Sequence, residues 1–183
     1  MLTLNDIGTI TRNNVQLILD QLRINLAVGD INDDDYRILC GGFGELNWDE
    51  FISSIGNHED RFEFCIKIKT VEGGVATGVP AGIALCLYSI SENSFDIYAV
   101  ENFCRNKPDH PLHGKMIQLT LMAAYLFSTA VKCATIRIIE PVQELLDFYA
   151  QYGFNLLPCK SIMQADVHMF SDIISKMAGN DTN

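Results

Sequence analysis

The chain lacks the long hydrophobic runs that membrane-spanning helices require. No stretch of its 183 residues approaches about 18 consecutive apolar side chains, so we expect no membrane partner. Its first residues lack a basic region followed by an apolar core, so we expect no signal peptide. Six cysteines are present, but none stands in a C-x-x-C pair and several lie within apolar runs. We therefore expect reduced, buried thiols in a cytoplasmic protein.

The chain is also short of positive charge. It has 13 lysines and arginines against 23 aspartates and glutamates, which gives a net charge of −10. A protein that holds long nucleic acid needs a basic surface, so this balance argues against nucleic acid as a partner. The acidity is compatible with the steering of amines, polyamines or lysine-rich peptides, and solubility alone would also account for it.

Metal-binding patterns are absent from the sequence as well, and we expect no metal. The four histidines and six cysteines lack the spacing of a zinc site. His110 and His113 lie three residues apart, but no third ligand is close in sequence. The acidic run Asp30–Asp35 begins like a calcium loop, yet Asp35 and Gly41 stand where such a loop needs glycine and glutamate. We predict a solvated acidic loop there.

Hydrophobic periodicity predicts one α/β (α+β) domain over residues 1–183. A helical portion would occupy residues 1–60, the core residues 61–170, and a helix or tail residues 171–183. An antiparallel meander followed by a strand–helix–strand unit indicates a mixed, mostly antiparallel sheet flanked by helices.

The expected elements follow from apolar spacing and from glycine and proline punctuation. They are a helix at about 11–28 capped by Thr11, a GGFG turn at 41–44, a short helix from Asn47 or Asp49 to Ile55 ended by Gly56, strands from Arg61 to about residue 68 and at Ala81–Ile90 and Phe95–Phe103, a helix from about Leu112 to Val131, a strand at 134–140, a helix at 141–152, a strand near 154–158, a stretch from Met163 to Met177 whose apolar residues have helical spacing, and a frayed end at 178–183.

The stretch from Ile136 to Phe154, IRIIEPVQELLDFYAQYGF, reads as a buried strand, a proline, a short amphipathic helix and a Gly-Phe pair before the next strand. It resembles the last conserved segment of the GNAT (GCN5-related) N-acetyltransferases, P-x(n)-F-Y-x-x-x-G-F. The resemblance covers roughly residues 61–170 and implies a divergent member with a GNAT-like sheet. It also implies a strand around Ala165–Phe170 with a short helix after it, which we expect in place of a helix over that stretch. In that family the tyrosine is often the general acid, and here the matching residue is Tyr149. At Val142 the chain departs from the asparagine of many members.

The resemblance also implies a binding loop for the pyrophosphate of acetyl-CoA just before the long helix. Backbone N–H groups and the positive end of a helix dipole favour an anion there. The family motif R/Q-x-x-G-x-G/A aligns best with Pro111 to Met116, where Gly114 matches, proline removes an N–H and methionine crowds the approach. Positive charge at His113 and Lys115 would offset these losses. The expected contacts to acetyl-CoA in this loop are His113, Gly114, Lys115 and Met116.

The strand Phe95–Phe103 is equivalent, by the same resemblance, to the family strand whose end splays from its neighbour. The backbone around Val100, Glu101 and Asn102 would bind the pantetheine amides. Glu101 is the first choice for the general base that takes a proton from the acceptor, directly or through water, and Asp96 is the second.

Tyr149 would protonate the leaving thiolate, for which a phenol with a pKa of about 10 is adequate. Cys104 lies beside this site, but no partner that would make it a nucleophile can be assigned, which favours a plain thiol.

The function that the resemblance implies is transfer of an acetyl group from acetyl-CoA to a primary amine, on a small molecule or a protein, by direct attack. The substitutions Pro111 and Met116 keep open a catalytically inactive GNAT-like binding or regulatory protein. A third reading, an acidic mimic of nucleic acid, is disfavoured because the charge is not densely clustered. Residues 30–60 are where acceptor contacts are expected. A homodimer is compatible with the sequence, which does not choose an oligomeric state.

Overall fold

The computed structural model describes residues 1–55 and 59–179, built around an eight-stranded mixed sheet of order β1-β2-β4-β5-β6-β8-β7. The strands are β1 (Leu26–Gly29), β2 (Arg61–Glu72), β3 (Val75–Ala76), β4 (Gly82–Ser89), β5 (Ser94–Asn102), β6 (Thr135–Ile139), β7 (Asn155–Leu156) and β8 (Ile162–Asp166). β3 pairs with β2 and stands outside this order. Within the described ranges β5 and β6 form the one parallel pair. The sheet is therefore mixed and mostly antiparallel, as the sequence predicts.

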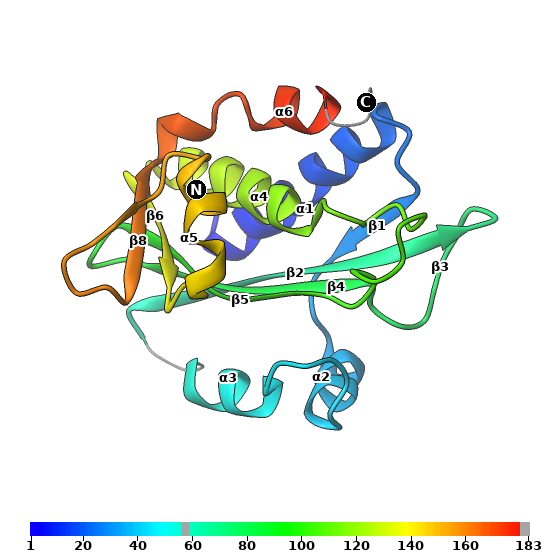
Figure 1. Cartoon of the computed structure of the whole chain (residues 1–183). Coiled ribbons are helices and arrows are strands. Elements are labelled where there is room, and N and C mark those ends of the chain that lie inside the picture. Colours follow the sequence, from blue (N-terminus) through cyan, green and yellow to red (C-terminus); the bar gives the residue numbers. More distant parts are fainter. Residues whose placement is uncertain (56–58, 180–183) are drawn as a thin grey trace.

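Helices cover both faces of this sheet (Figure 1). One face carries α1 (Leu4–Gln21), α4 (Met116–Val131), α5 (Leu146–Ala150) and α6 (Ile173–Gly179), and the other carries α2 (Asp33–Cys40) and α3 (Trp48–Ile55). A large apolar cluster fills the first interface and a smaller one, around Trp48 and Leu85, fills the second. None of the described helices is long and apolar enough to span a membrane.

The first helix lies seven residues earlier than the periodicity predicts. The hydroxyl of Thr3 accepts a hydrogen bond from the N–H of Asp6 (3.1 Å), and the Asp6 carboxylate accepts one from the N–H of Thr3 (2.8 Å). This capping box begins the helix at Leu4, so Thr11 is not its cap. The prediction of a helix over 11–28 is wrong at both ends, because residues 26–29 form the edge strand β1.

β1 is held against α1 by one side chain. The Gln16 amide donates to the carbonyl of Leu26 (3.1 Å) and accepts from the N–H of Val28 (2.8 Å). Arg23, with a φ of 57°, ends the helical path and turns the chain into the strand. These contacts explain why a helical pattern in the sequence gives way to a strand.

Half of the acidic run, Asp33–Asp35, forms the first turn of α2 and is not the solvated loop that the sequence predicts, whereas Asp30–Asn32 precede the helix. The Asn32 side chain accepts from the N–H of Asp35 (3.0 Å), and the Asp35 carboxylate accepts from the N–H of Asn32 (2.9 Å). Aspartates in a first helical turn also interact favourably with the helix dipole. Asp35 is buried and forms an ion pair with the buried Lys67 of β2, which fixes α2 on the sheet.

Several boundaries in the second half differ from expectation. α4 begins at Met116 and not near Leu112, because Gly114 has a φ of 69°. The expected helix at 141–152 is a 3₁₀ turn followed by five α-helical residues, and the strand near 154–158 has only two residues. The last strand precedes the expected one at Ala165–Phe170, since Val167 starts a 3₁₀ turn. The expected helix stop at Gly56 lies outside the described residues.

Candidate functional site

The sheet opens where β5 and β6 separate. Their parallel pairing runs only from Ser94 opposite Thr135 to Ile97 opposite Ile138. At this point the register of β5 against β4 shifts, so that Tyr98 is skipped as in a β-bulge, which bends a strand. β5 continues to Asn102 without a strand partner on the β6 side among the described residues.

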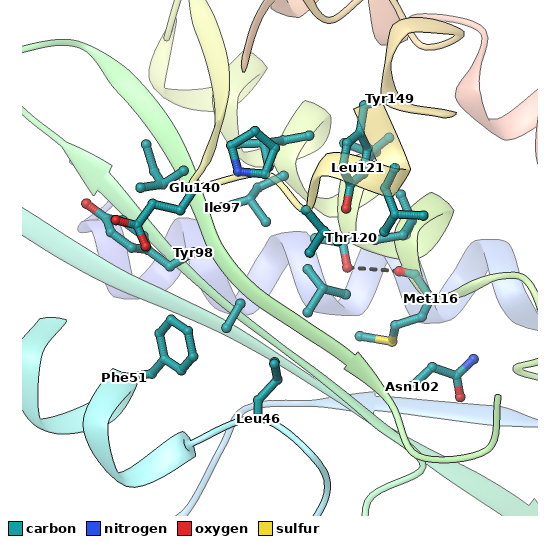
Figure 2. A pocket seen from close by; sticks show the side chains of 18 residues that line it. Leu46, Phe51, Ile97, Tyr98, Asn102, Met116, Thr120, Leu121, Glu140 and Tyr149 are labelled. Carbon is teal, nitrogen blue, oxygen red and sulfur yellow. Dashed lines mark hydrogen bonds between the residues drawn. The ribbon is translucent and has the colours of Figure 1, made fainter. Parts of the chain in front are cut away.

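A cavity of about 290 Å³ fills this opening. It reaches from α4 and α5 on one face of the sheet to the start of α3 on the other, as Figure 2 shows. Its walls are largely apolar. They are formed by Leu46, Phe51, Ile97, Tyr98, Ala99, Val100, Asn102, Met116, Ile117, Thr120, Leu121, Ile138, Ile139, Glu140, Pro141, Val142, Leu145 and Tyr149. A cavity with largely apolar walls and a few polar groups suits a mainly apolar ligand or ligand arm.

Tyr149 lies on α5 at the wall of this cavity. Its side chain is 7% exposed and makes edge contacts with the rings of Phe148 (5.7 Å) and Phe154 (6.3 Å). Figure 2 shows its hydroxyl pointing into the cavity. Burial raises the pKa of Tyr149, so the phenol stays protonated at neutral pH. A protonated phenol in this position is chemically able to donate a proton to a bound group.

The N-terminus of α4 opens beside the same cavity. Lys115 precedes the helix without a side-chain cap, and His113 and Gly114 are exposed. Met116 points inward: it is 3% exposed and lines the cavity. Its sulfur would be 2.6 Å from a Cβ added at Gly82, so the missing side chain of Gly82 makes its place. The sequence predicts that Met116 crowds the approach to the helix terminus. This prediction is wrong, because the Met116 side chain points into the cavity and not toward the outer side of the terminus.

Glu101 lies away from the cavity. Its carboxylate accepts hydrogen bonds from the N–H of Glu45 (2.6 Å), the N–H of Leu46 (3.3 Å) and the indole N–H of Trp48 (2.7 Å). Gly44, at a φ of 91°, lets the loop approach, because a Cβ there would be 2.7 Å from a Glu101 oxygen. These contacts anchor the start of α3 to β5. A carboxylate already used by three donors differs from the free carboxylate expected of a base.

Of the other residues singled out from the sequence, Asp96 and Cys104 are not among the cavity walls, whereas Val100 and Asn102 are. Asp96 is 4% exposed and binds Arg137 through two hydrogen bonds of 2.7 Å, so it too is already paired. Cys104 is buried beside Asn102, whose side chain accepts its N–H (2.9 Å). Val100 and Asn102, expected near pantetheine, both line the cavity.

Glu140 is the residue that the sequence pattern did not single out. It follows β6 with a φ of 50°, and its N–H donates to the carbonyl of Ser161 (2.7 Å). A non-glycine residue in this region is uncommon, and such strain gathers at functional sites. Figure 2 shows the Glu140 side chain reaching toward Tyr98 at the cavity's edge. The available signal was its place between a buried strand and Pro141.

A second cleft, of about 490 Å³, adjoins the cavity on the α3 side of the sheet. The two share Phe51, Tyr98, Ile139 and Glu140 as walls. Glu50 of α3 adds a second carboxylate, and Arg61 is the one basic residue among the walls that the structure describes. A ligand in this cleft would reach the cavity past Glu140.

No cluster of three or more histidine, cysteine, aspartate or glutamate side chains within residues 1–55 and 59–179 is arranged to hold a metal ion. Of the two histidines three residues apart, His113 is exposed and His110 has both ring nitrogens in hydrogen bonds.

Neither a protein-family model nor a curated protein matches this sequence. Its structure, however, is similar to solved ones. The AtaTR complex bound with acetyl-CoA has a TM-score of 0.56 at 14% identity, covering 84% of this chain and 98% of that one. A Klebsiella pneumoniae protein provisionally described as an acyl-CoA N-acyltransferase has a TM-score of 0.52 at 13% identity, covering 78% and 97%. An uncharacterised protein from Bacillus halodurans has a TM-score of 0.56 at 13% identity, covering 85% and 91%. Likeness at this level of identity shows the fold.

Proposed function

We propose that this chain, which has the GNAT fold, is an acetyl-CoA-dependent N-acetyltransferase that acts on a primary amine. The observation that carries the proposal is the apolar slot between β5 and β6, with the Tyr149 hydroxyl inside it and the N-terminus of α4 beside it. The pantetheine arm would lie along β5 where β6 has turned away. Val100, and the N–H of Asn102, would offer it backbone groups that have no strand neighbour there; the carbonyl of Asn102 already accepts from the N–H of Arg105 (3.3 Å).

The pyrophosphate of acetyl-CoA would bind at the start of α4. The first N–H groups of a helix have no intrahelical partner, and α4 has no side-chain cap. The exposed Gly114 lets a phosphate approach the backbone, and His113 and Lys115 would add positive charge. Because Met116 is turned into the cavity, this surface is more open than the motif alone suggests.

The amine would approach from the polar cleft on the α3 side and attack the thioester carbonyl directly. Glu140 lies between cleft and cavity, so we assign it the removal of a proton from the ammonium, directly or through water. The C–N bond forms, the C–S bond breaks, and Tyr149 gives its proton to the departing sulfur. The second proton that the nitrogen loses would pass through solvent to the Tyr149 phenolate and restore the phenol, and Glu140 would release the first proton to solvent. Glu101 then acts as a positioning residue, because its three donors hold α3 beside the cleft.

The second candidate is a protein that binds acyl-CoA without transferring the acyl group. Pro111 favours it, because proline removes one N–H from the pyrophosphate loop. The two candidates differ in whether the acyl group is transferred to an amine after acyl-CoA has bound.

Thermal melting with acetyl-CoA, followed by a CoA-release assay with a panel of primary amines, separates these candidates. A ligand that binds only the folded state must raise Tm, so both candidates require a shift with acetyl-CoA. Release of CoA that depends on amine supports the transferase. A shift without release under any amine supports the binding protein, and no shift at about 1 mM acetyl-CoA contradicts both.

A further inference from the structure

The loop that joins β5 to α4 depends on the peptide groups around one buried residue, Leu112. Its side chain is fully buried, and its δ-carbon would be 2.8 Å from a Cβ at Gly82. Its carbonyl accepts from the Asn102 side chain and from the N–H of Lys115, both at 3.1 Å. Its N–H donates to Nδ1 of His110 at 3.1 Å. The direction in which the chain enters residues 113–115 is therefore set by these partners.

His110 ties this loop to the sheet. Its Nε2 lies 2.9 Å from the hydroxyl oxygen of Thr70 on β2. A neutral imidazole has one donor nitrogen and one acceptor nitrogen. Because Nδ1 accepts the N–H of Leu112, Nε2 carries the proton and donates it to Thr70. Both bonds can exist together only while His110 is neutral.

The surroundings of His110 favour that neutral form. Partial burial, followed by the charge of Lys107, lowers the pKa of His110, while Glu72 on β2 acts in the opposite direction. At neutral pH the imidazole is therefore uncharged. Protonation would add a hydrogen to Nδ1, opposite the N–H of Leu112, so that two donors face each other and a half-buried N–H loses its acceptor.

We propose that neutral His110 is a positioning residue that holds residues 111–115 in the conformation able to bind the pyrophosphate, and that its protonation releases this loop and weakens the binding of acyl-CoA. The holding of the loop stands on the hydrogen bonds alone. The consequence for acyl-CoA rests on the proposed function.

Two substitutions separate the two bonds of the imidazole. His110→Asn keeps an acceptor at the position of Nδ1 and cannot titrate. His110→Gln extends toward Thr70 but has no acceptor at that position. At about pH 7.5 we expect His110→Asn to bind acetyl-CoA within about twofold of the native affinity, and His110→Gln about tenfold more weakly. The loss should appear in Kd and in KM for acetyl-CoA, and kcat at saturating acetyl-CoA should stay nearly the same.

Titration supplies the decisive comparison. Between about pH 7.5 and about pH 5 the native protein should lose about tenfold in acetyl-CoA affinity beyond whatever His110→Asn loses over the same range. His168→Gln, at an exposed histidine on the 3₁₀ turn after β8 and outside this loop, should follow the native curve. Parallel curves for the native protein and His110→Asn would overturn the proposal.

NMR of the native protein tests the loop without any ligand. At neutral pH the imidazole nitrogens of His110 should show a proton on Nε2 and none on Nδ1. The protection factor of the Leu112 amide, which compares its exchange rate with the intrinsic rate at each pH, should fall as His110 becomes protonated. A proton on Nδ1 at neutral pH, or a Leu112 amide that stays equally protected through the titration, rules the proposal out. If Leu112 responds while acetyl-CoA binds at no pH, the positioning role stands and the proposed function is wrong.

Discussion

At the scale of single residues, the proposed chemistry of the cavity rests on Tyr149 and Glu140. Burial raises the pKa of the Tyr149 phenol, which suits a proton donor. Glu140 lies at the passage between cavity and cleft. The two other carboxylates considered, Asp96 and Glu101, are both engaged by hydrogen-bond donors. Two predictions follow from the contrast between carboxylates that already accept hydrogen bonds and side chains that line the cavity.

Tyr149→Phe should lower kcat about a hundredfold, because general acid catalysis contributes roughly that factor, while acetyl-CoA binds as before. Steady-state CoA release and calorimetric titration measure the two quantities. Tyr152→Phe is the matched control: Tyr152 is 9% exposed on the following turn and is not among the cavity walls. Equal turnover in Tyr149→Phe and the native protein would remove the phenol from the mechanism.

Glu140→Gln and Glu101→Gln should fail in different ways. Glu140→Gln should reduce kcat/KM for the amine about a hundredfold with Tm nearly unchanged, because the exposed carboxylate has a chemical role. Glu101→Gln should lower Tm by about 5–10 °C, because an amide group would face the donors of Glu45, Leu46 and Trp48. If Glu101→Gln is stable but inactive and Glu140→Gln is active, the general base is Glu101 and not Glu140.

At the scale of elements, the sequence predicts best where side-chain periodicity alone decides the structure. The meander strands and the long buried helix α4 appear where apolar spacing puts them. The predictions are wrong where a side-chain hydrogen bond or a partner distant in sequence determines the secondary structure. Thr3 with Asp6 and Asn32 with Asp35 are capping boxes that could have been read in advance. The pairing of Asp35 with Lys67, 32 residues away, has no local signature.

This ion pair gives a stability prediction for α2. Lys67→Met should cost about 3–5 kcal/mol of the free energy of unfolding, because it leaves the Asp35 carboxylate buried without its partner. Urea denaturation measures the loss. Arg37→Met is the control, since Arg37 pairs with Asp34 at the exposed surface, where side chains are 77% and 80% accessible and pairs contribute little. A similar, small loss in both variants would mean that Lys67 does not stabilise α2.

At the scale of the whole molecule, the site exists because one strand pair ends early. Tyr149 could be found in advance because a short motif surrounds it. The slot itself could not, because it depends on the register of β5 against β4 and β6. The same holds for Met116, whose inward position depends on Gly82 on another strand. A methionine that would crowd the loop on the sequence alone is thus accommodated by a glycine on another strand.

The net charge of −10 would act on the two proposed substrates in opposite directions. A cationic amine is attracted to the molecule as a whole and to Glu50 and Glu140 in the cleft. Acetyl-CoA, an anion, is repelled by the same field. Raising the ionic strength screens both effects, so kcat/KM for a diamine should fall while the association rate of acetyl-CoA rises. Steady-state assays and stopped-flow mixing over a salt series would measure the two trends.

Glu50→Gln separates the cleft from the molecule's overall charge. Glu50 lines the cleft but not the cavity, so this variant should flatten the salt dependence for the diamine more than a neutralised carboxylate far from the cleft, such as Asp34→Asn, whose side chain is 80% exposed on α2. Both variants should leave the acetyl-CoA trend nearly the same. If the two variants flatten the diamine curve equally, the attraction is a property of the whole surface, and the acceptor does not enter past Glu50.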